Sequence, residues 1–150
     1  MIPTSTRGCH RWRPIGREPS PVLVDTTIVS DLVRRRNGPV VQAIGRIGHR
    51  GIATSIVSVA ELRSGCARRG SARLLDQVEA VLAGIEIIPF EPPADTAQGR
   101  SRAGLEAAGQ LIGPNDLLIA ARALTLGVPL VTADQAEFRR VRGLAVETWL

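Results

Sequence analysis

The chain has 150 residues, of which 44% are hydrophobic and 22% charged, and this composition suits one globular domain rather than two. Its net charge of +5 comes from arginine, since the sequence contains no lysine, and a surplus of guanidinium groups favours an anionic partner such as RNA or DNA. The lack of lysine excludes enzymes that need a Schiff base, a phosphate-loop lysine or a lysine general base.

Residues 1–20 differ in character from the rest of the chain. They are rich in Pro, Gly, Ser and Arg and show no apolar period, so we predict a flexible N-terminal extension and a folded domain over residues 21–150. Cys9 and Cys66 form neither a metal-binding spacing nor a disulfide framework, which fits a reducing compartment. We find no apolar run of about eighteen residues and no signal-like segment. We therefore expect a cytoplasmic protein without a membrane partner.

Short apolar strands and helices alternate from Val22 onward. Strands are predicted at residues 22–25, 51–55, 85–90, 129–132 and 144–149. Helices are predicted at residues 26–35, 40–47, 56–70, 72–84, 94–110 and 115–127, with Gly99, Gly104 and Gly109 interrupting the fifth, and a short helical turn precedes the last strand. Because the strands are runs of Val, Ile and Leu separated by helices, we predict a parallel sheet covered on both faces.

Four acidic residues are placed where such a sheet forms its ligand site, outside the carboxyl ends of the strands. Asp25 ends the first strand, and Asp134 follows the fourth. Glu61 lies one turn into the helix after the second strand, and Asp116 opens the helix that leads into the fourth. The topology allows all four carboxylates to face one crevice.

Each acid also has a purely structural interpretation. Asp25 can cap the helix that follows it, and Asn115 can cap a helix that starts at the next residue. Asp134 and Glu137 resemble a capping pair for a short helix. Glu61 can be a solvated helix residue, which is the usual fate of glutamate.

The functional interpretation follows from the charge of the group as a whole. Carboxylates that converge on one crevice repel one another unless a cation compensates their charge. Oxygen ligands with open positions suit Mg²⁺ or Mn²⁺ rather than Zn²⁺. His10 and His49 lie outside the pattern of acids, so acid–base work would fall to water activated by a metal. The residues therefore indicate metal-assisted hydrolysis of phosphodiesters.

Four segments carry a resemblance to a known family: VLVDTTIVSDL, SIVSVAELRSG, GPNDLLIAARAL and LVTADQAEF. In order and spacing they resemble the signature segments of PIN-domain ribonucleases, specifically the VapC-type toxins of bacterial toxin–antitoxin pairs. The match runs from about Val22 to Trp149. It implies a three-layer α/β/α sandwich with a central parallel sheet and a Mg²⁺- or Mn²⁺-dependent endoribonuclease. The implied catalytic residues and metal ligands are Asp25, Glu61, Asp116 and Asp134, and supporting hydrogen bonds are assigned to Thr26 and Thr132.

The resemblance also implies partners: an RNA substrate, a small VapB-type antitoxin and a second copy in a homodimer. An antitoxin helix could dock on apolar residues of the predicted helices, namely Ile28, Leu32, Ile44, Ile47, Leu74, Leu75 and Val78. These residues could equally pack on the sheet or in the homodimer. Five basic residues could contact phosphates or stay solvated at helix ends: Arg34, Arg35, Arg36, Arg68 and Arg69.

Other functions compete with this interpretation. A haloacid-dehalogenase-type phosphatase needs a second Asp where this chain has Thr27 and also a later Lys, so it is excluded. A receiver domain is excluded because it too needs a Lys. A DNA nuclease stays open, as does a PIN fold that binds RNA or protein without cleaving. The intact set of acids argues against a pure binder, which has no reason to concentrate negative charge where phosphates must dock.

Overall fold

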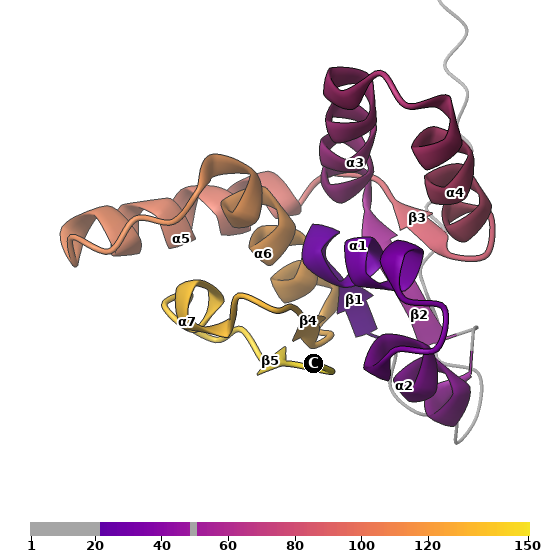
Figure 1. Cartoon of the computed structure of the whole chain (residues 1–150). Coiled ribbons are helices and arrows are strands. Elements are labelled where there is room, and N and C mark those ends of the chain that lie inside the picture. Colours follow the sequence, from indigo (N-terminus) through magenta and orange to yellow (C-terminus); the bar gives the residue numbers. More distant parts are fainter. Residues whose placement is uncertain (1–21, 49–50) are drawn as a thin grey trace, which may run out of the picture.

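A computed structural model describes residues 22–48 and 51–150 of the chain. The predicted N-terminal extension, residues 1–20, lies outside the described residues. Five parallel strands form one sheet in the order β3-β2-β1-β4-β5 (Figure 1). The strands are β1 (Val22–Val24), β2 (Ile52–Ser55), β3 (Glu86–Ile88), β4 (Leu130–Val131) and β5 (Val146–Glu147). The predicted parallel sheet is therefore confirmed, with the first strand at its centre.

Seven helices connect and cover the strands in the described part of the chain. They are α1 (Thr26–Arg34), α2 (Pro39–Ile47), α3 (Ile56–Arg69), α4 (Ala72–Leu82), α5 (Ala94–Ala107), α6 (Pro114–Leu126) and α7 (Gln135–Phe138). Helices α1 to α4 lie on one side of the sheet and α5 to α7 on the other (Figure 1). The predicted three-layer α/β/α sandwich is confirmed. None of these helices is long and apolar enough to cross a membrane.

The position of β1 at the centre of the sheet explains why its sequence does not alternate between apolar and polar residues. Val22 and Val24 belong to a core shared with α1 to α4, whereas Leu23 between them belongs to a second core shared with α5 to α7. Successive side chains of a strand point to opposite faces, and here both faces are covered. All three residues of β1 are therefore buried, and the next residue, Asp25, emerges at the carboxyl edge of the sheet.

Two local predictions about helices are wrong. Helix α6 begins at Pro114 with Gly113 in the capping position, so Asn115 lies inside the first turn and is not the cap. Proline suits the first helical position because its missing N–H has no partner there in any case. Helix α5 runs unbroken through Gly99 and Gly104, because glycine costs a helix only about 1 kcal/mol and packing against a neighbour offsets this. Gly109 follows the helix with a φ of 65°, in the left-handed region that favours glycine.

Candidate active site

Asp25 is anchored at the centre of the carboxyl edge by its position after β1. Its side chain is 3% exposed. Oδ1 accepts hydrogen bonds from the backbone N–H of Ile28 at 3.1 Å and from Oγ1 of Thr27 at 2.6 Å. Oδ2 accepts one from Oγ1 of Thr132 at 2.5 Å. The predicted helix cap is thus present, and Thr132, 107 positions further along the chain, holds the other carboxylate oxygen.

Two threonine hydroxyls connect this carboxylate to the loop after β4. Thr27 Oγ1 accepts the backbone N–H of Ala133 at 3.0 Å, and Thr132 Oγ1 accepts that of Asp134 at 3.0 Å. Because each hydroxyl accepts from a backbone N–H, its own hydrogen is free to point at Asp25. The network fixes the orientation of Asp25 and the position of the loop that carries Asp134. This role of Thr27 is not predicted from the sequence, since no spacing pattern marks it.

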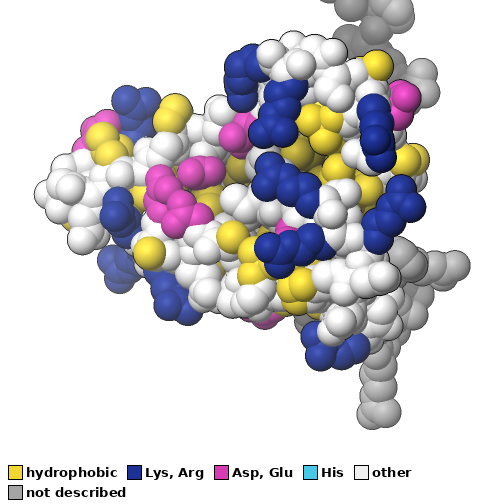
Figure 2. Space-filling model, viewed as in Figure 1, with side chains coloured by type: hydrophobic (Ala, Val, Ile, Leu, Met, Phe, Trp, Pro, Cys, Tyr) yellow, Lys and Arg dark blue, Asp and Glu magenta, His cyan; other side chains and the backbone are white. Residues whose placement is uncertain are grey.

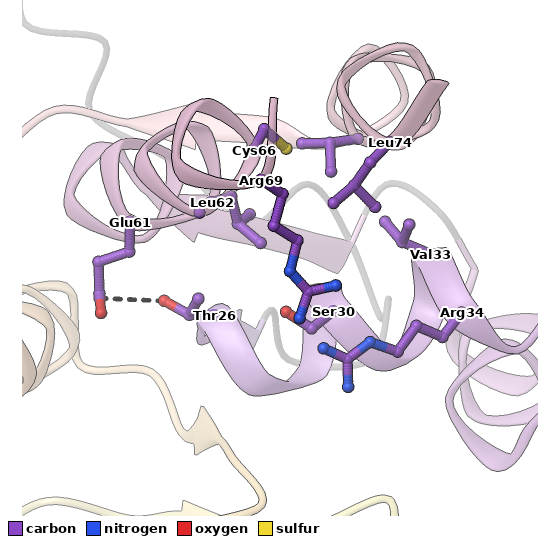
Figure 3. A pocket seen from close by; sticks show the side chains of 11 residues that line it. Thr26, Ser30, Val33, Arg34, Glu61, Leu62, Cys66, Arg69 and Leu74 are labelled. Carbon is purple, nitrogen blue, oxygen red and sulfur yellow. Dashed lines mark hydrogen bonds between the residues drawn. The ribbon is translucent and has the colours of Figure 1, made fainter. Parts of the chain in front are cut away.

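Glu61 reaches the same edge from α3, which follows β2 directly. Its Oε1 accepts a hydrogen bond from Oγ1 of Thr26 at 3.0 Å, as the dashed line in Figure 3 shows. The Glu61 side chain is half-buried, so it is not simply a solvated helix residue. The structure places Thr26 beside Glu61 and Thr132 beside Asp25, each next to one of the predicted acids.

Asp116 lies in the first turn of α6, where the charges of the other acids affect its pKa. Burial, and then the charges of Glu137, Glu61, Asp25 and Asp134, raise the pKa of the Asp116 carboxyl to about 6. Burial also raises the pKa of Asp25, although its hydrogen bonds oppose that effect. Figure 2 shows acidic side chains gathered near the start of α6, with arginines around them. The structure thus brings the four predicted acids to one edge of the sheet.

Glu137 is a fifth acid of the site, for which the sequence suggests only a capping pair with Asp134. That pair does not form, because Asp134 stands at the start of α7 without a side-chain cap hydrogen bond. Oε1 of Glu137 instead accepts the backbone N–H of Gly113 at 2.8 Å. A Cβ added at Gly113 would meet Oδ2 of Asp116 at 3.3 Å, so glycine leaves room for this carboxylate. Glu137 therefore secures the loop from which α6 and Asp116 begin.

The raised pKa of Asp116 predicts how stability depends on pH in metal-free buffer. Its pKa is about 6 in the native state against 3.8 for an unperturbed Asp, so the native protein binds more protons between these values. The free energy of unfolding should therefore fall as pH rises from about 4 to 6. The full shift corresponds to about 3 kcal/mol. Because the side chain is only half-buried, we expect about 1–2 kcal/mol.

The measurement is urea unfolding in a chelator at pH values across this window, on the parent chain and on Asp116→Asn. The variant lacks the charge that titrates, so it should be about 1 kcal/mol more stable than the parent at pH 7.5 and no more stable at pH 4. This net gain allows for the favourable interaction of Asp116 with the helix dipole, about 0.3–1 kcal/mol, which the variant loses. A variant less stable than the parent at pH 7.5 would contradict mutual repulsion among the acids.

Known proteins are similar to this chain in sequence and in fold. The family model for the PIN domain matches residues 22–144. Ribonuclease VapC2 of Haemophilus influenzae is 31% identical over 129 residues, 85% of this chain and 97% of the relative. The tRNA(fMet)-specific endonuclease VapC of Shigella flexneri is 36% identical over 77 residues, 51% of this chain and 58% of the relative. The solved structure of VapBC2 from Rickettsia felis, bound to a DNA fragment from its promoter, matches with a TM-score of 0.78 at 28% identity, covering 86% of this chain and 98% of that chain.

The chain therefore belongs to the PIN domain family, in the VapC group. This confirms the resemblance inferred from the four segments of the sequence. All five acids of the site lie within the residues that the family model matches.

Proposed function

We propose that this protein is the ribonuclease toxin of a toxin–antitoxin pair, a metal-dependent endonuclease that hydrolyses RNA phosphodiesters and is held in check by a small antitoxin. One observation carries the proposal: burial, together with the charges of four other acids, raises the pKa of Asp116 to about 6 at the carboxyl edge of the sheet. Such a concentration of negative charge opposes folding and opposes phosphate binding unless a cation compensates it. The names of the similar VapC proteins support RNA as the substrate.

The donor set at the site fits Mg²⁺ or Mn²⁺. Every candidate ligand is a carboxylate oxygen, and hard divalent cations prefer oxygen; we assign the ion to Asp25, Glu61, Asp116 and Asp134. Within residues 22–48 and 51–150, no three His, Cys, Asp or Glu side chains are grouped closely enough to hold an ion as they stand. The proposal therefore requires the carboxylates to draw together when the ion binds. When bound, the ion would activate water and stabilise the leaving oxygen.

Neighbouring residues of the chain hold the proposed metal ligands in position. Thr27 and Thr132 hold the two oxygens of Asp25 in one orientation, as hydrogen-bond partners of metal ligands generally do. Thr26 does the same for one oxygen of Glu61. Glu137 holds Gly113 and with it the start of α6. Asp25, Glu61 and Asp116 are thus presented from the end of a strand and from two helices, and Asp134 from a loop that Thr132 holds.

A comparison of substrates tests the proposal. Single-stranded RNA, structured RNA and single-stranded DNA of matched sequence are incubated with the protein in Mg²⁺, in Mn²⁺ or in a chelator. We expect cleavage of RNA that depends on either metal and no cleavage of the DNA. Equal cleavage of DNA would identify a DNA nuclease, and RNA binding without cleavage would identify a binding module.

The structure changes the predicted antitoxin surface. Ile28 and Val78 are buried in the core between the sheet and α1 to α4, so they offer a partner little surface. Ile44 belongs to the same core but also lines a hollow at the surface. Leu32, Ile47 and Leu74 pack partly against the same core, and only Leu75 of the seven residues is exposed.

An apolar hollow between α1, α2 and α4 offers a better dock. It encloses about 480 Å³ and is lined by Leu32, Val41, Gly45, Val81 and Ile85 among others. We assign the antitoxin to this hollow, where an amphipathic helix would bury its apolar face.

The homodimer stays a prediction, which size-exclusion chromatography of the free chain tests.

A further inference from the structure

A groove apart from this hollow begins at Glu61 of the active site and leads away from it between α1, α3 and α4. It encloses about 140 Å³, and apolar side chains, including Leu62, Cys66 and Val78, form its floor. Thr26 and Glu61 stand at one end, joined by their hydrogen bond (Figure 3). The groove is therefore continuous with the site described above.

The residues that line the two walls of the groove follow the helical repeat. Helix α1 contributes Thr26, Ser30 and Arg34, and α3 contributes Glu61, Gly65 and Arg69. Residues four apart lie on the same face of a helix, so each wall shows a polar residue of the active site, then a small residue, then an arginine. Eight residues of helix rise about 12 Å. Both arginines are therefore placed about 12 Å along the groove from the acid end.

Arg34 and Arg69 line the groove from its two walls. Figure 3 shows both guanidinium groups turned toward the hydroxyl of Ser30. The ion pairs found among the described residues involve Arg35, Arg63, Arg102 and Arg122. Neither Arg34 nor Arg69 forms an ion pair or a side-chain hydrogen bond there. Two arginines thus share one small space without a counter-charge from the described part of the chain.

We propose that Arg34, Arg69 and Ser30 form a binding subsite for a phosphate of the RNA next along the chain from the phosphate that is cleaved. This inference rests on the proposed ribonuclease function. A guanidinium fork binds phosphate oxygens through two parallel hydrogen bonds, and a serine hydroxyl adds a third donor. Because the acids repel a polyanion, the substrate needs cationic contacts outside them. The arginine pair supplies these contacts in the direction in which the groove leaves the site.

The lack of a side chain at Gly65 leaves room for an RNA strand along the groove. A Cβ added there would meet no atom nearer than Nη2 of Arg68 at 4.0 Å. The groove is therefore open at its midpoint because this residue has no side chain. An acidic segment of a partner protein could use the same arginines, but it would meet Glu61 at the far end with nothing to compensate that charge. An RNA phosphate at that end would share the proposed cation with the acids.

The experiment compares Arg34→Ala, Arg69→Ala and the double variant with Arg102→Ala. Arg102 is an exposed arginine on α5 that pairs with Glu106 and does not line the groove, so its loss changes the net charge equally. Binding of a labelled single-stranded RNA to each variant, in an Asp116→Asn background that prevents cleavage, is measured by fluorescence anisotropy at several salt concentrations. We expect about tenfold weaker binding for each groove variant. Affinity falls as salt rises, and a plot of log affinity against log salt should become shallower by about 0.7 for each phosphate that the variant no longer neutralises.

Two further arms test the position of the subsite. Gly65→Leu should weaken binding of the same RNA about as much as the arginine variants, without a change of charge. In the cleavage assay, Arg34→Ala and Arg69→Ala should raise KM for a long RNA and leave a dinucleotide with a single phosphate unaffected, since that phosphate lies at the acids.

Groove variants that bind RNA no more weakly than Arg102→Ala would overturn the subsite. Unchanged RNA binding together with loss of the antitoxin complex would assign the arginines to a protein partner instead. If the parent chain cleaves no RNA, the proposed function fails, and the binding titration still decides whether the subsite exists.

Discussion

Asp25→Asn, Glu61→Gln and Asp116→Asn should each lower RNA cleavage by at least about a hundredfold while the chain stays folded. Each change removes a charge from the group that would hold the metal, whose stabilisation of the transition state amounts to several kcal/mol, and each factor of ten in rate corresponds to about 1.4 kcal/mol. Folding should survive because asparagine also caps helices well at the position of Asp25. Cleavage of labelled RNA, with circular dichroism on the same samples, measures both effects.

Glu106→Gln serves as the matched control for these variants. Glu106 is an exposed acid on α5 that pairs with Arg102 and takes no part in the site, so its loss should leave the cleavage rate within about twofold of the parent. An Asp116→Asn variant that cleaves as fast as the parent would return Asp116 to the role of a stabilising acid in the first turn of α6.

Coexpression of this chain with the proposed small antitoxin should give a stable complex in which metal-dependent RNA cleavage is suppressed. The proposed contact is the hollow between α1, α2 and α4, which an apolar helix face would fill. A basic antitoxin side chain could also reach the acids, where an arginine fork would pair with carboxylates that otherwise need a metal. Size-exclusion chromatography and the cleavage assay, carried out on the purified complex, measure the two expectations.

Gly45→Arg tests the location of this contact. A Cβ at Gly45 meets no heavy atom within 4 Å, so the variant should fold and fill the hollow with a charged side chain. We expect complex formation to weaken by at least about tenfold, while RNA cleavage by the free chain is unchanged. Gly99→Arg on α5, where a Cβ is also unobstructed, adds the same charge elsewhere and should leave the complex intact. Full cleavage activity in the wild-type complex, or no complex at all, would contradict the antitoxin proposal and leave the nuclease proposal standing.

The order and type of the helices and strands could be predicted from the sequence because each carries a strong local signal. The three residues of β1 are all apolar, which indicates a strand with both faces covered. Helix ends were harder, since caps depend on one or two backbone angles rather than on a repeating pattern. The sequence predicts Asn115 as the cap of α6, but the helix begins at Pro114, one residue earlier.

By itself, the sequence determined that four acids stand near strand ends in a parallel α/β fold, because the chain places Asp25 after a buried strand and Asp134 after another. Only the tertiary structure decided which groups these acids meet. β1 pairs with both β2 and β4, and this pairing brings Thr132 to Asp25 across 107 positions of sequence. The same packing turns Glu137 toward Gly113 and away from the capping role expected of it. Strand order and long-range hydrogen bonds arise from contacts between distant segments, which the periodicity of one segment does not encode.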